Sequence, residues 1–244
     1  MSATVQHSSH RPPVTIADHH PMGISTGVLG GVWGDWPELV RRACEISTHA
    51  IELSALSGAE LPGLIDYLRA RPRLPFRYVS AHAPAKAFAS DDAWRLHGLP
   101  VWLRSIVAHP DTIVDPAPYQ ALGTRLVLEN MDGRKARGGT PAELAESFAQ
   151  MPDAGFCFDV AHAHSIDPTM ELAHELLDRF RTRLRHVHLS SLDESGVHVP
   201  LTEQDEGTFA DVLDRCRDVP WILEAEPPQR WAAQLRGPVL RLVS

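Results

Sequence analysis

Six short apolar runs in this chain each end in a histidine, an aspartate or a glutamate. The runs cover residues 78–82, 106–109, 126–129, 156–159, 187–188 and 221–224, and they end in His82, His109, Glu129, Asp159, His188 and Glu224. Imidazole and carboxylate groups are the ligands that divalent transition metals prefer. Six such endings at fairly regular intervals indicate that the strand ends converge on one place, which predicts a metal site there.

The elements that would position these residues alternate between strand and helix. We expect strands at residues 22–25, 50–53, 76–81, 106–108, 125–128, 155–158, 186–189 and 221–223. We expect helices after the caps at Asp35 and Thr140, and at residues 61–71, 94–103, 116–122, 173–184, 209–217 and 231–243. Short strands that are apolar on both faces are typical of a buried parallel sheet. The eight strand–helix units predict an α/β fold, a single (β/α)8 TIM barrel with its metal site at the C-terminal face.

The competing architecture is an open, doubly wound parallel sheet. Its signature would be a glycine-rich phosphate turn directly after the first strand. Gly27, Gly30 and Gly31 follow the first strand, but their spacing fits neither a dinucleotide turn nor a P-loop. The barrel is therefore the predicted fold.

Length and composition fit one globular domain. The chain has 244 residues, close to the roughly 250 of a (β/α)8 barrel, and 43% of its residues are hydrophobic. Residues 1–20 are polar and rich in His, Ser and Pro, so we expect a disordered leader there and the barrel domain in residues 21–244. The leader lacks the apolar core of a signal peptide, and no run approaches a membrane span. We therefore expect a cytoplasmic protein without membrane contact.

Charge and cysteine content narrow the expected partners. The formal net charge is −8, and Lys86 and Lys135 are the only lysines. An acidic chain without a basic cluster lacks the electrostatic footprint of a nucleic-acid-binding protein, so we expect a small-molecule partner instead. Cys44, Cys157 and Cys216 form an odd, sparse set within apolar segments, which is typical of reduced thiols in a cytoplasm.

The carboxylates and histidines at strand ends each have two interpretations. Glu129 and Glu224 follow apolar residues, and a buried carboxylate is costly unless it is paired. We expect them to bind metal or transfer protons, and the alternative is a salt bridge to an arginine. His82 and His109 are candidate ligands, and the alternative is a core histidine that hydrogen-bonds a neighbour. Glu52, at the end of the second strand, is a candidate for holding a metal ligand in place through a hydrogen bond, without binding the metal itself.

Further candidate residues follow the sixth and seventh strands. Asp159 and His162 lie three residues apart, so a tight turn would bring both to one cluster. His186 and His188 alternate and therefore share one face of a strand. His188 is nearer the C-terminal end and is the predicted ligand, whereas His186 lies deeper or supports the site. His198 follows in a loop, where the alternative is an exposed histidine without a role.

Taken together, these patterns resemble the xylose isomerase-like barrel superfamily, which includes sugar isomerases and epimerases and the endonuclease IV family. The resemblance covers most of the chain, from Ile24 to about Pro228. It rests on the segments Ser80-Ala81-His82-Ala83-Pro84, Ala108-His109-Pro110, Leu128-Glu129-Asn130, Phe158-Asp159-Val160-Ala161-His162-Ala163, His186-Val187-His188-Leu189 and Ile222-Leu223-Glu224.

The resemblance implies a central divalent metal. Mixed histidine and carboxylate sites accept Zn, Mn, Co or Fe. The ligands of the central metal would be Glu129, Asp159, His188 and Glu224. In the endonuclease-like branch a second metal is held by residues at the positions of His82 and His109 and is bridged by the residue at the position of Glu129.

The same branch has a third metal, and here this sequence departs from the pattern. The resemblance implies that His162 and His198 would help to hold it, together with an aspartate two residues before His198. Gly196 stands at that position. Asp193 or Glu194 could substitute from a shifted loop, and otherwise the third site is weakened or absent.

Three hypotheses of function follow from the resemblance and the ligand set. The favoured one is a metal-dependent isomerase or epimerase of a small sugar or sugar-like hydroxy-ketone, with Glu129 and Glu224 moving a proton. The alternative is a multi-metal phosphoesterase of the endonuclease IV type, which would use the additional histidines. The third is a metal-binding barrel without catalysis, or an accessory subunit.

Overall fold

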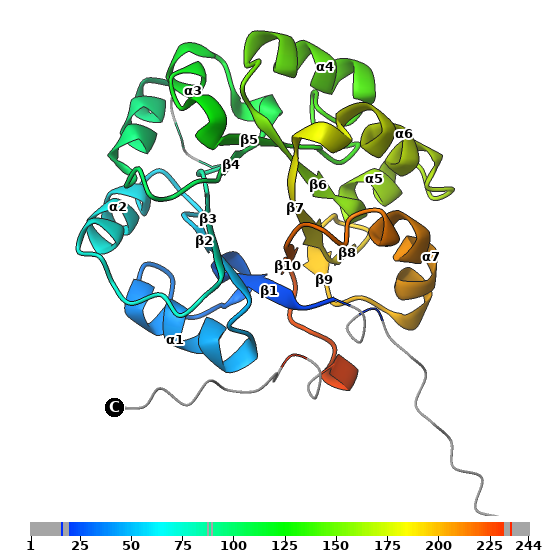
Figure 1. The fold of residues 1–244 in the computed structure, drawn as a ribbon, viewed down its shortest axis with the longest axis horizontal. Helices are drawn as coiled ribbons and strands as arrows, with labels where there is room; N and C mark the ends of the chain where they lie inside the picture. Colours follow the sequence, from blue (N-terminus) through cyan, green and yellow to red (C-terminus); the bar gives the residue numbers. More distant parts are fainter. Residues whose placement is uncertain (1–15, 17–19, 87, 89, 232–234, 236–244) are drawn as a thin grey trace, which may run out of the picture.

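Figure 1 shows a closed barrel of parallel strands surrounded by helices. The computed structural model describes residues 16, 20–86, 88, 90–231 and 235. The strand order is β1-β10-β7-β6-β5-β4-β3-β2, and it closes because β1 pairs in parallel with both β10 and β2. The predicted (β/α)8 TIM barrel is confirmed.

The strands of the barrel match the expected apolar runs to within about two residues at most boundaries. They are β1 (Met22–Ser25), β2 (Ala50–Ser54), β3 (Tyr78–His82), β4 (Ile106–Ala108), β5 (Leu126–Glu129), β6 (Gly155–Asp159), β7 (Leu184–Leu189) and β10 (Trp221–Leu223). The helices are α1 (Trp36–Ile46), α2 (Leu61–Arg69), α3 (Ala117–Gln120), α4 (Pro141–Gln150), α5 (Val160–Ile166), α6 (Glu171–Phe180) and α7 (Glu203–Asp214).

Local capping explains why several helices begin where they do. The Asp35 side chain accepts a hydrogen bond from the backbone N–H of Glu38 at the start of α1. At α4 both halves of the predicted capping box form, because Thr140 Oγ1 accepts from Glu143 N–H and the Glu143 carboxylate accepts from Thr140 N–H. These caps satisfy backbone donors that have no partner within the helix.

The structure differs from the sequence expectation in four places. Residues 94–103 were expected to form a helix, but a 3-10 helix, Ser90–Gly98, ends there before Pro100, which lacks a backbone N–H. The helix α5 and a small hairpin of β8 (Ser191–Leu192) and β9 (His198–Val199) were not expected. The helix α7 begins earlier than expected, at a capping box of Thr202 and Asp205.

Two expectations fall mainly outside the described residues. The expected last helix, residues 231–243, is described only at Trp231 and at residue 235. The expected leader is described only at Ile16 and His20, and both contact the barrel domain. The Ile16 N–H donates to Glu206, and the His20 ring stacks on Trp221 with 4.1 Å between ring centroids.

The described residues also bear on the thiols and on membrane insertion. Cys157 and Cys216 are buried, Cys44 is partly buried, and all three are free thiols, as expected. Among the helices that the structure describes, none combines the length and apolar character that a bilayer span requires.

Candidate metal centre

The predicted ligand residues meet at the C-terminal end of the barrel. His82, Glu129 and Asp159 are the last residues of β3, β5 and β6, and His109 and Glu224 directly follow β4 and β10. Parallel strands closed into a barrel place these ends on one face. All eight predicted ligand residues fall into three groups of converging ligand atoms, each within 4.8 Å of one another: His82, His109 and Glu129; Glu129, Asp159, His188 and Glu224; Asp159, His162 and His198.

The first group is built around one oxygen of Glu129. Its Oε2 atom lies 3.2 Å from Nε2 of His82 and 3.3 Å from Nε2 of His109. A divalent ion bound tetrahedrally at about 2.0–2.2 Å separates its ligand atoms by about 3.4 Å. The spacing of these three atoms therefore fits a shared metal ion.

The protonation of His82 supports the same interpretation. Its Nδ1–H donates to the carbonyl oxygen of Ala83 at 2.7 Å. In the neutral ring the lone pair of Nε2 would then face the carboxylate of Glu129, which is unfavourable unless a proton or a metal ion lies between them. In the absence of metal, a proton on Nε2 fills this role. Burial disfavours the charged ring, but the hydrogen bond to Glu129 and the negative charges of Glu52, Glu129 and Glu224 together outweigh it and raise the pKa of His82 to about 9.

The second group surrounds His188, which is fully buried on β7. Its Nδ1 atom lies 3.5 Å from Glu129 Oε1 and 3.3 Å from Glu224 Oε1. Among the described residues, the buried Nδ1 of His188 and the buried Oδ2 of Asp159 have no hydrogen-bond partner. Unpaired buried polar atoms are costly, and a divalent cation held by this group would satisfy both.

The third group depends on Asn130, which directly follows β5. The Asn130 side chain bridges to the backbone of Asp159, donating to its carbonyl oxygen and accepting from its N–H, each at 2.8 Å. The His162 N–H donates to Asp159 Oδ1 at the start of α5, and His162 Nδ1–H donates to the Asn130 carbonyl. The tight turn predicted between Asp159 and His162 is thus the first turn of a helix.

The carboxylates of the site differ in the direction of their pKa shifts. Burial opposes ionisation of Glu129, but the positive charge of His188 and other histidines outweighs it, so the pKa lies well below its usual range. The same balance lowers the pKa of Glu224 to about 2. For Asp159, burial prevails and raises the pKa to about 6. A bound cation would favour the ionised form of all three.

The position of Gly196 shows how this chain departs from a third metal site. A Cβ atom at Gly196 would lie 1.6 Å from the Arg134 guanidinium carbon, so Arg134 fills the space of a side chain there. Asp193 does not substitute, because its Oδ1 accepts hydrogen bonds from the backbone of Ser195 and Val197 within its own turn. Neither Asp193 nor Glu194 belongs to a ligand group among the described residues.

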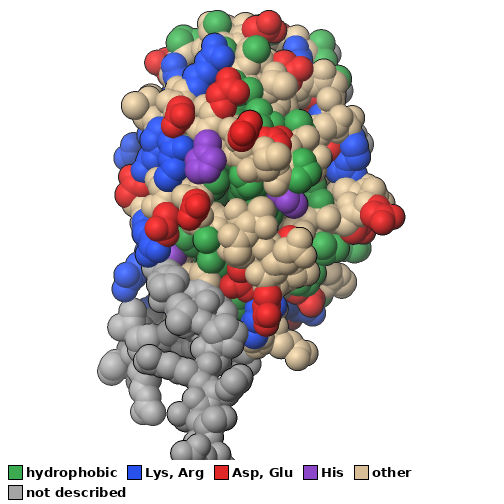
Figure 2. All heavy atoms as spheres, turned by 90° about the vertical axis from the view of Figure 1, so that its right-hand side faces the viewer, with side chains coloured by type: hydrophobic (Ala, Val, Ile, Leu, Met, Phe, Trp, Pro, Cys, Tyr) green, Lys and Arg blue, Asp and Glu red, His purple; other side chains and the backbone are tan. Residues whose placement is uncertain are grey.

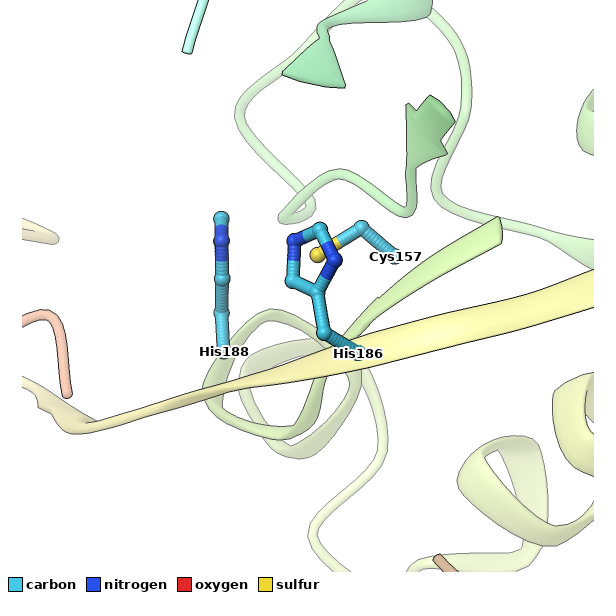
Figure 3. A group of neighbouring side chains, drawn as sticks. All are labelled: Cys157, His186 and His188. Carbon is cyan, nitrogen blue, oxygen red and sulfur yellow. The ribbon is translucent and has the colours of Figure 1, made fainter. Parts of the chain in front are cut away.

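A polar cluster lies deeper in the barrel, beneath the second group. Glu52 is completely buried on β2, and its Oε1 lies 3.1 Å from His188 Nε2. Ser80 donates to the other oxygen of Glu52 at 2.9 Å. Figure 3 shows Cys157 on β6 beside His186 on β7, with His188 further along β7. The sequence suggested a supporting role for Glu52 and His186, but no spacing indicated that Cys157 would join them.

A cavity of about 960 Å³ opens above the three groups. Six of the eight candidate ligands line it: His82, His109, Glu129, His162, His198 and Glu224. Asp159 and His188 lie beneath them, fully buried. The volume lies within the range of small-molecule sites, about 300–1,000 Å³.

The family follows from a sequence comparison. The model of the xylose isomerase-like TIM barrel family matches residues 117–241, slightly more than half of the chain. The chain belongs to this family. The family includes sugar isomerases and epimerases and endonuclease IV-like enzymes, and its members commonly bind divalent metals. No curated protein matches the chain.

Solved structures show the same fold at low sequence identity. An L-ribulose 3-epimerase is 12% identical in sequence with a TM-score of 0.55, and the alignment covers 92% of this chain and 88% of the epimerase chain. Endonuclease IV from Thermus thermophilus is 21% identical with a TM-score of 0.53, covering 88% and 94%. A xylose isomerase-like protein from Mycobacterium smegmatis, in complex with magnesium, is 13% identical with a TM-score of 0.51, covering 90% and 94%.

Proposed function

We propose that the protein is a divalent-metal-dependent isomerase or epimerase of a small hydroxy-ketone, a sugar or a sugar-like polyol. The observation that carries this proposal is the group Glu129, Asp159, His188 and Glu224, in which three carboxylates and one imidazole converge beneath a cavity of about 960 Å³. Membership of a family that includes sugar isomerases and epimerases supports it.

The chain's residues can divide the work between holding a cation and moving a proton. The bound divalent ion would act as a Lewis acid towards a carbonyl and an adjacent hydroxyl. Asp159 and His188 are buried beneath the cavity, so they can only hold the ion, whereas Glu129 and Glu224 also line the cavity. The depressed pKa of both glutamates keeps them ionised at neutral pH, the form that removes a proton from carbon. We assign to them the removal and return of the proton next to the carbonyl.

Hydrogen exchange with solvent tests this assignment directly. The protein is loaded in turn with Mn, Co, Mg or Zn and incubated in deuterated water with a panel of ketoses and aldoses. We expect deuterium on the carbon next to the carbonyl of at least one sugar, followed by a second sugar, both detected by NMR. We expect the Glu224→Gln variant to lose the exchange. Absence of exchange for every metal and every sugar in the panel would contradict the proposal.

A second candidate function is hydrolysis of a phosphate ester. The observation that favours it is the first ligand group, because His82 and His109 both face Glu129 Oε2 and a one-metal isomerase does not need them. Two ions sharing Glu129 would suit the activation of water and the neutralisation of a leaving oxygen. The net charge of −8 disfavours DNA as the substrate. Incision of an abasic-site duplex at low salt would favour this candidate, and failure to incise would remove its DNA form.

A further inference from the structure

The two lysines of the chain lie at the same cavity. Lys86, in the segment after β3, and Lys135, in the segment after β5, both line it, although the chain has 23 lysines and arginines and a net charge of −8. Lys86 is exposed and takes part in no ion pair among the described residues. Lys135 Nζ lies 3.7 Å from Asp111, beyond hydrogen-bonding distance. Both ammonium groups therefore have hydrogen-bonding capacity to offer a ligand.

A third cation, Arg134, is built into the cavity wall. Its guanidinium donates to Asp132 Oδ1 at 2.8 Å and to the carbonyl oxygen of Gly196 at 2.8 Å, and it also contacts the carbonyl of Ser195. Gly196 has φ +74°, and the absence of its side chain leaves the space that Arg134 fills. A cation thus occupies the place where the family resemblance implies a metal-binding aspartate.

The carboxylates beneath the cavity, Glu129, Asp159 and Glu224, could balance the charge of these cations in metal-free protein. Once metal is bound, it would take up much of their negative charge. Each divalent ion brings two positive charges, so one ion would offset two of the three negative charges of the carboxylates of the second group, and two ions would exceed all three. A cationic rim above metal-bound carboxylates attracts anions and raises their local concentration.

We propose that Lys86, Arg134 and Lys135 form a cationic rim that binds an anionic group of the substrate, a phosphate or a carboxylate. This inference rests on the proposed function, in which the other end of the substrate is a hydroxy-ketone that would bind the metal. The substrate class is then a small hydroxy-ketone with a terminal anionic group. Lysine and arginine bind such oxygen anions through charge-assisted hydrogen bonds.

Inorganic phosphate is the first probe, and it is titrated into metal-loaded protein, in which bound metal offsets the charge of the carboxylates. Comparison with the lysine variant then separates phosphate binding at the rim from phosphate binding to the metal. We expect calorimetry to detect phosphate binding that weakens as salt is added. In the Lys86→Gln/Lys135→Gln double variant we expect the affinity to fall by about tenfold or more. The matched control is Arg104→Gln, because Arg104 is exposed just before β4, at the opposite end of the barrel, and its loss should leave phosphate binding unchanged. Phosphate binding that is undetectable, or equal in the double variant and the wild type, would overturn the proposal.

A second experiment tests whether the anionic group of the substrate is a phosphate or a carboxylate. It also tests the cationic rim separately from the proposed isomerase activity. Deuterium exchange by metal-loaded protein is compared for D-fructose, D-fructose 6-phosphate and 5-keto-D-gluconate. The rim predicts a preference for one anionic member that shrinks in the double variant and persists in Arg104→Gln. Exchange of fructose without any preference, together with lysine-independent phosphate binding, would overturn the rim and leave the isomerase intact. Lysine-dependent phosphate binding without exchange of any sugar would support the rim and count against the isomerase.

Discussion

At the scale of single residues, the protein fixes one ring nitrogen of several candidate ligands and leaves the other for the site. His82 and His162 donate from Nδ1 to the backbone carbonyls of Ala83 and Asn130. His188 presents Nε2 to Glu52 and Nδ1 to Glu224 of the second group. The sequence predicted the residue types at strand ends, but not which nitrogen faces the site, because that depends on backbone carbonyls brought close by the fold.

The contact between Glu52 and His188 predicts a positioning effect on metal binding. Glu52 Oε1 lies 3.1 Å from Nε2 of His188, and a carboxylate beside the second nitrogen of a ligating histidine can orient the ring and make it a stronger ligand. We expect the Glu52→Gln variant to bind Mn or Zn about 10–100-fold more weakly than the wild type, measured by competition with a chromophoric chelator. The exposed Glu203→Gln serves as control, since Glu203 lies on α7 away from the cavity lining. Equal affinity of Glu52→Gln and wild type would show that Glu52 does not act through His188.

The protonation of the histidines predicts that metal binding releases protons. The pKa of His82 is raised to about 9; that of His162 is raised to about 10, since the opposing effect of burial is outweighed by Asp159 and Glu129. Both rings are therefore positively charged imidazolium groups at pH 7.5 in the metal-free protein, and each must lose its second ring proton to bind metal. We expect affinity to rise from pH 6 to pH 9. Calorimetry in buffers of different ionisation enthalpy would reveal the released protons, and a buffer-independent enthalpy would contradict the prediction.

At the scale of elements, the strands and helix starts that depend on neighbouring residues could be predicted from the sequence, whereas contacts between distant segments could not. The strands and the caps of α1 and α4 followed from apolar runs and from residues three apart. The helix α5 was not expected, because its start depends on Asp159 capping His162 at the end of a buried strand. The contact of Arg134 with Gly196 joins two segments 62 residues apart, and no local pattern reports such a contact.

The closure of the barrel predicts an intolerance of side chains at Gly23 on β1. A Cβ atom there would lie 2.4 Å from both the Cβ and the carbonyl oxygen of Ala50 on β2, where the backbone cannot yield easily. We expect Gly23→Ala to lower the free energy of unfolding by about 1–3 kcal/mol, measured by urea denaturation. The matched control is Gly207→Ala on α7, where nothing lies within 4 Å. It should raise the free energy of unfolding by about 0.5–1 kcal/mol. A Gly23→Ala variant as stable as the wild type would show that β1 and β2 can separate at this point.

At the scale of the whole molecule, the distribution of charge supports the small substrate that we propose. On the face shown in Figure 2, acidic and basic side chains are interspersed. The net charge is −8, whereas both lysines line the cavity. The sequence predicted the barrel and the convergence of the candidate ligand residues because parallel strands in a barrel share one open end. The cationic rim could not be predicted, because it depends on how separate segments meet above that end.

The metal content of the protein tests the central claim most directly. Untagged wild-type protein and a Glu129→Gln variant are loaded with Mn, Co or Zn, dialysed, and measured for metal per chain, with Glu203→Gln as the control. Because Glu129 belongs to both the first and the second ligand group, its loss should affect both. We predict at least one equivalent in the wild type and the control, and a sharp fall in Glu129→Gln. Wild-type protein that retains none of the three metals would contradict the metal centre and, with it, the proposed function.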